Sequence, residues 1–235
     1  MANTEIGTFS AAVDECIARS GRADKKNDII SYLRQSVLEC QVLKLFRQDY
    51  VEDQLTATSD PYVWTAPVNL RALDIVSYPN ILDPQNNPVY PVYMEPGKGQ
   101  RRLDYFFYRS GDSYVFTGHD RIGIGNQPIN IAYYTFMDRL QYFEASSRPA
   151  RFYVETLSWE YLTAVTPTEK AAAQAQVTNW LIFTWYEAII EGALAKIFKL
   201  VGDGRAVSSF ALFSSFKNDL KAGSGLASTG RALPT

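Results

Sequence analysis

The chain has 235 residues and a hydrophobic fraction of 46%, so it can bury a sizeable core as one large domain or two small ones. Its 23 basic and 25 acidic residues give a net charge of -2, which excludes a whole-molecule attraction to nucleic acid or to an anionic membrane. One histidine and two cysteines are too few for a metal site of several imidazoles, a cysteine zinc site or a disulfide scaffold.

The first 45 residues predict a pair of helices. One is expected over residues 10–20, because apolar side chains recur every four positions and Gly21 can form a left-handed cap. The second is expected over residues 28–41, whose apolar side chains also share one face. Cys16 and Cys40 fall in these two helices, and we expect both to be buried free thiols in a reducing compartment.

Residues 46–164 have the composition of strands and turns. Short runs of aromatic and β-branched residues alternate with Pro, Gly, Asn and Asp. Strands are expected over residues 50–56, 62–65, 70–77, 103–108, 113–117 and 129–137. Gly111 can adopt a positive φ, which predicts a hairpin between two aromatic runs. Residues 80–100 contain four prolines and predict a long exposed loop.

The helical pattern returns after residue 164. A capping box at residues 166–169 predicts a short helix to about residue 176. The next helix is expected over residues 179–201; it is apolar around most of its circumference, but its charged residues exclude a membrane span. Gly202 ends it, and a last helix is expected over residues 205–221, antiparallel to its predecessor. That last helix repeats apolar residues on one face: Val207, Phe210, Phe213 and Leu220.

These elements predict an α+β fold. We expect the helices of residues 1–45 and 165–222 to form one helical bundle, and residues 46–164 to form an antiparallel β-rich insertion. Residues 223–235 are rich in Gly and Ser and predict a flexible, extended C-terminal tail. The first residues lack the basic and apolar regions of a secretory signal, so we expect the chain to be made in a cytoplasm.

The sequence offers no recognisable catalytic motif, so we expect a protein that is not an enzyme and uses no cofactor or metal. His119 lies in FTGHDRIG, which is typical of a turn between strands, and no G-x-S-x-G elbow accompanies it. Gly123 and Gly125 form a G-x-G, but Pro128 stands where the third glycine of a dinucleotide-binding motif would fall.

Two local groups of basic residues have two interpretations each. Lys98, Arg101 and Arg102 form either a solvated loop or a contact to phosphate or to an acidic partner surface. Arg148 and Arg151 either cap local structure or bridge two subunits.

Two stretches carry a resemblance to a known family. They are YVWTAPVNLRALDIVSYPN, residues 62–80, and NWLIFTWYEAIIEGALAKIFKLVGDGRAVSSF, residues 179–210. The first resembles a strand region of bacteriophage head-to-tail adaptor proteins, with its apolar-Pro-x-apolar pattern and its Tyr-Pro. The second is similar to their long C-terminal helix, with Trp near the start, a centre of small residues and an acidic-glycine break. The order of elements resembles that family over residues 8–221.

The resemblance implies a structural virion protein of the head-tail junction, made in the host cytoplasm. Adaptors of this family form a ring of copies, usually dodecameric, beneath the portal protein. The ring extends the DNA channel, lets DNA pass without specific binding, and presents a platform for tail proteins such as a nozzle, tube or fibre. The resemblance also implies a C-terminal tail that orders along the portal, with contact candidates Gly223, Leu226, Arg231 and Leu233. Candidates for the contact between subunits are Arg148, Arg151, Trp180 and Trp185.

Two other functions stay open. A tail-tube or baseplate subunit would also combine strands, aromatic residues and a nearly neutral charge. A small hydrolase, or a domain that binds a small ligand or sugar, would use exposed aromatic side chains, and the chain has 15 Tyr and 4 Trp.

Overall fold

The computed structural model describes residues 8–95, 105–118, 126–137, 139–140, 142 and 178–227, with side chains described to residue 222. Within these residues the chain forms five α-helices and two sheets, so the predicted α+β class is confirmed. Contacts divide the chain into two units. The helical unit is Met1–Gln48 with Met137–Thr235, and the sheet unit is Asp49–Phe136.

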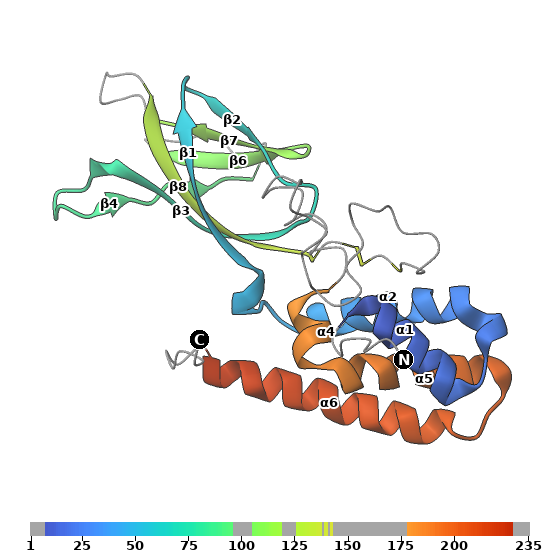
Figure 1. Cartoon of the computed structure of the whole chain (residues 1–235). Helices are drawn as coiled ribbons and strands as arrows, with labels where there is room; N and C mark the ends of the chain where they lie inside the picture. Colours follow the sequence, from blue (N-terminus) through green and yellow to red (C-terminus); the bar gives the residue numbers. More distant parts are fainter. Residues whose placement is uncertain are drawn as a thin grey trace, which may run out of the picture. The chain divides into compact units, whose positions relative to one another are not determined.

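The helical unit takes helices from both ends of the sequence. They are α1 (Phe9–Ser20), the 3-10 turn Ala23–Lys25, α2 (Lys26–Gln41), α4 (Trp180–Thr184), α5 (Tyr186–Val201) and α6 (Ala206–Ala227). Helix α5 packs against α1, α2 and α6, and α1 packs against α2. Figure 1 shows α6, in red, running back along α5, in orange, so the two helices are antiparallel as predicted.

Local capping signals fix several helix ends. At the start of α1 the Thr8 Oγ1 accepts a hydrogen bond from the Ala11 N–H at 3.2 Å. Gly21, with φ 68°, ends α1, and Gly202, with φ 73°, ends α5. The left-handed cap predicted at Gly21 is confirmed, and Gly202, predicted to end its helix, does so in the same conformation, where a side chain would be strained.

One hydrophobic core joins the N-terminal and C-terminal helices. Its buried side chains include Phe9, Val13, Ile29, Leu33, Leu181, Ile182, Ile189, Ile190, Phe213 and Leu220. Phe46 lies in the same core, with its ring 5.0 Å from that of Trp180, although the sequence placed it in the β-rich region. The sheet unit therefore begins later than expected, at Asp49, because Phe46 is buried by packing against residues distant in sequence.

The two cysteines are free and buried in this core, as predicted. Burial raises the pKa of the Cys40 thiol from 9.0 to about 12, and it also raises the pKa of Cys16. Since the thiolate is the reactive form, neither cysteine should react with Ellman's reagent at pH 8 in the folded protein, whereas both should react in denaturant. Rapid reaction of one thiol before unfolding would contradict its burial.

The same shift predicts a dependence of stability on pH. Between pH 9 and 12 the unfolded chain releases the Cys40 proton while the folded chain keeps it, so the free energy of unfolding should fall as the pH rises through this window. Urea unfolding of the wild type and of Cys40→Ala on either side of pH 9 measures the effect. The substitution should weaken the dependence.

The long helix expected over residues 179–201 is in fact two helices. Trp185 leaves the helical conformation, with φ -120° and ψ 37°, and separates α4 from α5. Its ring is partly buried against the helical core, so side-chain packing overrides the continuous apolar pattern from which one helix was predicted. The short helix expected near residue 170 lies outside the described residues.

Helix α6 corrects two predictions. It continues to Ala227, past the expected end at residue 221, because no proline or left-handed glycine stops it, so the predicted tail does not begin at residue 223. The predicted apolar face is also wrong: Phe213 is buried, but Val207 is exposed. Steps of three residues drift around a helix, and Val207 lies roughly 120° from Phe213 at 3.6 residues per turn.

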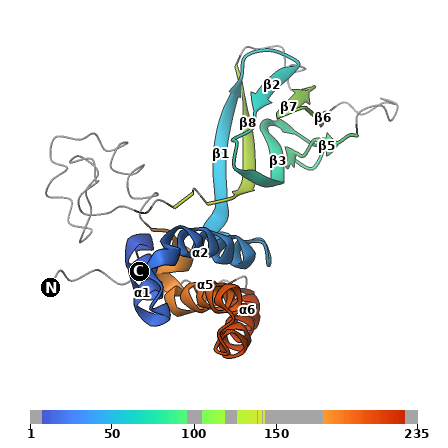
Figure 2. The same cartoon turned by 90° about the vertical axis from the view of Figure 1, so that its right-hand side faces the viewer.

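The sheet unit consists of two packed sheets. The strands are β1 (Tyr50–Ala57), β2 (Tyr62–Thr65), β3 (Leu70–Leu82), β4 (Pro88–Val89), β5 (Val92–Tyr93), β6 (Phe106–Ser110), β7 (Ser113–Thr117) and β8 (Gln127–Thr135). The first sheet has the order β1-β8-β3-β4 and the second β2-β7-β6-β5. Figure 2 shows β1, β8 and β3 beside one another. All pairings are antiparallel except β5 with β6, and a 3-10 turn at Arg47–Asp49 precedes β1.

The core of the sheet unit lies between the inner faces of its two sheets. Ile129, Ile131 and Tyr133 alternate along β8 and face it, as the two-residue period of a strand requires. The second sheet contributes Phe107 and Phe116, whose rings stack at 5.7 Å. Much of the high aromatic content is therefore core, while Asn130 and Tyr134 on the other face of β8 are partly exposed.

The sheet unit confirms part of the prediction and corrects another part. Gly111 turns the β6–β7 hairpin with φ 61°, and β2 and β7 have the predicted bounds. The expected loop of residues 80–100, however, contains the end of β3 and the short strands β4 and β5. Both short strands lie at sheet edges, where proline is tolerated because one side of the strand needs no hydrogen-bonding partner.

Candidate interaction surfaces

An apolar stripe runs along the outer side of α6. It consists of Val207, Phe210 and Ala211, called the α6 stripe from here on, and its spacing of three and four residues places all three on one face. Val207 is 77% exposed and Phe210 61% exposed. The other side of the helix holds the buried Phe213 and packs on α5, so the helix is anchored by one face and open on the other.

Polar contacts fix the start of this helix. The Arg205 guanidinium pairs with Asp203, with Nη2 2.7 Å from Oδ2, and holds the pKa of that carboxyl below its usual value. Arg205 Nη1 also donates to the Arg19 carbonyl oxygen at 3.2 Å, and its guanidinium lies 4.2 Å from the centre of the Phe198 ring. These contacts tie the turn before the α6 stripe to α1 and α5.

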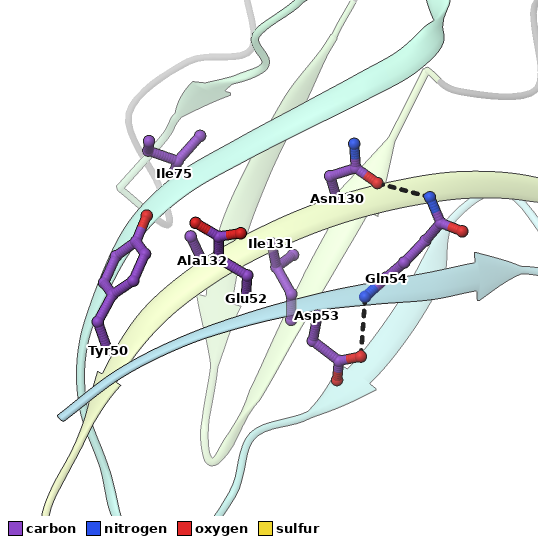
Figure 3. Close-up of a pocket in the computed structure, with 8 residues that line it drawn as sticks. All are labelled: Tyr50, Glu52, Asp53, Gln54, Ile75, Asn130, Ile131 and Ala132. Atoms are coloured by element: carbon purple, nitrogen blue, oxygen red, sulfur yellow. Dashed lines mark hydrogen bonds between the residues drawn. The ribbon is translucent and has the colours of Figure 1, made fainter. Parts of the chain in front are cut away.

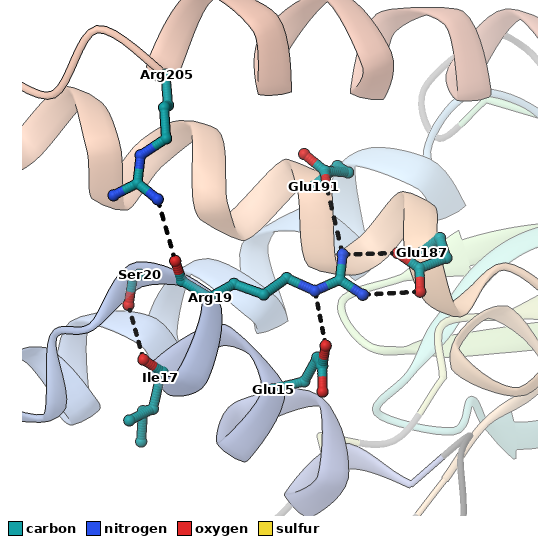
Figure 4. Close-up of polar contacts among 7 residues, drawn as sticks. All are labelled: Glu15, Ile17, Arg19, Ser20, Glu187, Glu191 and Arg205. Atoms are coloured by element: carbon teal, nitrogen blue, oxygen red, sulfur yellow. Dashed lines mark hydrogen bonds and ion pairs between the residues drawn. The ribbon is translucent and has the colours of Figure 1, made fainter.

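Three carboxylates surround Arg19, as Figure 4 shows. Its Nε lies 2.7 Å from Glu15, and its Nη1 lies 2.8 Å from Glu187 and 3.5 Å from Glu191. We call these four residues the Arg19 group. The hydrogen bond to Glu187 is the largest cause of the raised pKa of Arg19. One positive charge among three negative ones makes the surface between α1 and α5 acidic.

A pocket of about 500 Å³ lies on the outer face of the first sheet (Figure 3). Its lining comes from β1, β8 and β3: Tyr50, Glu52, Asp53, Gln54, Ile75, Asn130, Ile131 and Ala132. The register pairs Gln54 with Asn130, and Gln54 Nε2 donates to Asn130 Oδ1 at 2.8 Å. The Tyr50 ring lies 5.0 Å from that of Tyr134. The pocket combines amide groups, the Glu52 carboxylate and an aromatic wall.

The pocket's chemistry favours binding over acid-base catalysis. Glu52 and Asp53 are consecutive in β1, so their side chains leave opposite faces of the strand and do not form a facing pair. Partial burial, followed by the charges of Asp74 and Glu52, raises the pKa of Tyr50, so the phenol stays protonated and able to donate a hydrogen bond near pH 7. Among the described residues no cluster of His, Cys, Asp and Glu has metal-binding geometry.

The predicted site residues are spread over the chain. The Trp180 and Trp185 rings pack against the helical core of their own chain and are only partly buried, so part of each stays open to a neighbour. Gly223 and Leu226 fall in the last turns of α6. Five further residues singled out in the sequence lie outside the described residues: His119, Arg148, Arg151, Arg231 and Leu233.

Sequence reasoning missed the features that depend on distant residues. The pocket needs the register between β1 and β8, and the Arg19 group joins residues of α1 and α5. Val207 and Phe210 were predicted on one apolar face with Phe213, whereas in the structure they are exposed and Phe213 is buried.

Comparison with models of protein families gives no match, and no curated protein matches the chain. No helix among the described residues is both long and apolar enough to span a bilayer.

Proposed function

We propose that this chain is a structural subunit of a bacteriophage particle: a head-to-tail adaptor that assembles with copies of itself into a ring beneath the portal protein. The α6 stripe is the observation that carries the proposal. Burying one large apolar side chain gains about 1.5–3 kcal/mol, and within the part of the chain that the structure describes Val207 and Phe210 are largely exposed. A neighbouring subunit that covers them supplies that gain, so the stripe suits a subunit of an assembly.

In this proposal the N-terminal and C-terminal helices form a bundle that carries the contacts between subunits. Helix α6 leads directly to the C-terminal residues, so Gly223, Leu226, Arg231 and Leu233 are the proposed contacts to the portal. The sheet unit presents its outer face to a tail protein. DNA passes through the ring without specific binding, which fits a chain with a net charge of -2.

Co-expression with the portal protein encoded in the same genome tests the proposal. The full chain should co-purify with the portal, and a chain truncated after Ala227 should co-purify less well. Truncation at Ala227 keeps the whole of α6, so a loss reports the last eight residues and not a damaged helix. Failure of the full chain to co-purify at any ratio of the two proteins would contradict the adaptor proposal.

The pocket favours a second candidate, a domain that binds a sugar or another small polar ligand. Amide side chains such as Gln54 and Asn130 hydrogen-bond hydroxyl groups, and a tyrosine ring such as that of Tyr50 packs against an apolar face of a ligand. A thermal-shift screen with oligosaccharides distinguishes the two functions. A ligand that raises the melting temperature of the wild type but not of Gln54→Ala would support this candidate.

A further inference from the structure

The pocket on the outer face of the first sheet is built around one small residue. Ala132 lies in β8, between β1 and β3, and the register pairs it with Glu52 on one side and with Ile75 on the other. Its methyl group is shorter than both neighbouring side chains, so the sheet is hollowed above it. Figure 3 shows the Glu52 carboxylate and the Tyr50 ring beside Ala132 on the same face of the sheet. The pocket therefore has an apolar floor and walls of different chemistry.

The two ends of the pocket differ. At one end the register pairs Tyr50 with Tyr134, and their two rings, 5.0 Å apart, make the aromatic wall. At the other end Gln54 donates one hydrogen bond to Asn130, which leaves the side-chain oxygen of Gln54 able to accept another. A ligand in the pocket thus meets aromatic rings at one end and amide groups at the other.

The charge of the pocket is negative. Glu52 points into it, whereas the Asp53 side chain leaves the opposite face of β1, and no Lys, Arg or His lines the pocket. Among the described residues Glu52 takes part in no ion pair. Asp74 adds a second negative charge nearby, since partial burial and then the charges of Asp74 and Glu52 raise the pKa of Tyr50. A cation that enters the pocket is therefore attracted by two carboxylates.

We propose that the pocket binds a primary ammonium group carried on an alkyl chain, with the ammonium against Glu52 and the chain against Ile75 and Ala132. This inference rests on the ligand-binding candidate proposed above and names the class of its ligand. An ammonium group adds ionic attraction to its hydrogen bond with a carboxylate, and an aromatic ring such as that of Tyr50 also attracts a cation. A hydroxyl group in the same place would lack the ionic attraction, and an anion would be repelled.

Two sources carry this group: a free diamine, and a lysine side chain of a partner protein. Cadaverine represents the first and Nα-acetyl-lysine methylamide the second, and each is titrated into the full chain by isothermal titration calorimetry at low salt. Pentanediol has the chain length of cadaverine without its charge. At least one amine should bind at a saturable site, and pentanediol should bind about tenfold more weakly or not at all. Tighter binding of the lysine derivative would identify a protein side chain as the source, and tighter binding of cadaverine a free diamine.

Two variants test the role of the carboxylate. Glu52→Gln keeps the shape of the side chain and removes its charge, so it should weaken binding of the amine by about tenfold or more. Glu52 is exposed, so the melting temperature of this variant should equal that of the wild type. Asp112→Asn removes the same charge from the turn of the β6–β7 hairpin, outside the pocket, and should bind the amine as the wild type does. Full binding by Glu52→Gln, or equal loss in both variants, would overturn the proposal.

Neutral oligosaccharides separate this inference from the function on which it rests. If an oligosaccharide stabilises the wild type but not Gln54→Ala, and no amine binds, the pocket is a ligand site and the ammonium assignment is wrong. If neither kind of ligand binds, the ligand-binding candidate fails, and this inference fails with it.

Discussion

Replacing Gly192 by alanine should lower the free energy of unfolding by about 1–3 kcal/mol, the usual cost of overpacking a core. Gly192 lies in α5 where α2 and α6 both approach. A Cβ atom there would lie 2.7 Å from Ser36 Oγ and 2.8 Å from a ring carbon of Phe213. Both neighbours are buried, so they have little room to move. Urea unfolding measures the change.

Gly204→Ala is the matched control, because nothing lies within 4 Å of its Cβ position and its φ is not in the left-handed region. It should leave stability unchanged or raise it slightly by restricting the unfolded chain. A second variant tests the cause: Phe213→Leu shortens the obstructing ring, so the double variant should lose less than the sum of the two single losses. Equal stability of Gly192→Ala and wild type would contradict the close packing of the three helices.

Placing aspartate at Val207 and Phe210 should weaken assembly with the portal at least tenfold while leaving the isolated chain folded. Each is a large apolar anchor, and loss of one such anchor from a buried interface costs about 2 kcal/mol or more. Both side chains are mainly exposed in the single chain, so its melting temperature should hardly change. Co-purification and circular dichroism measure the two effects separately.

Leu212→Asp is the matched control for the α6 stripe. Leu212 is 50% exposed on the same helix, and the substitution removes an apolar side chain and adds a charge in the same way. Its side chain points away from the stripe, so assembly should be retained. Equal loss of assembly in both variants would show that the charge of α6, and not the stripe, matters.

Local signals predicted the parts of the fold that short segments determine. Gly21, Gly111 and Gly202 were placed correctly because each turn needs a positive φ that glycine adopts at little cost. Strands β2 and β7 were predicted with their observed bounds, because aromatic and β-branched residues mark them and glycine, proline and polar turns delimit them. The mixed α+β class followed from the same patterns.

Features set by distant contacts were not predictable in this way. The break at Trp185 and the burial of Phe46 depend on packing between helices from the two ends of the chain. The face of α6 was misjudged because four apolar residues are distributed around more than one side of the helix, and only contact with α5 selects the buried side. The pocket requires three strands whose register no local motif encodes.

Native mass spectrometry of the complex formed with the portal protein tests the adaptor proposal directly, because it counts the copies of this chain. We expect the same fixed number of several copies on every portal ring, and loss of those copies when the α6 stripe carries aspartate. A portal ring with no copy bound, or with a single copy, would contradict the adaptor proposal and favour a tail-tube or baseplate subunit.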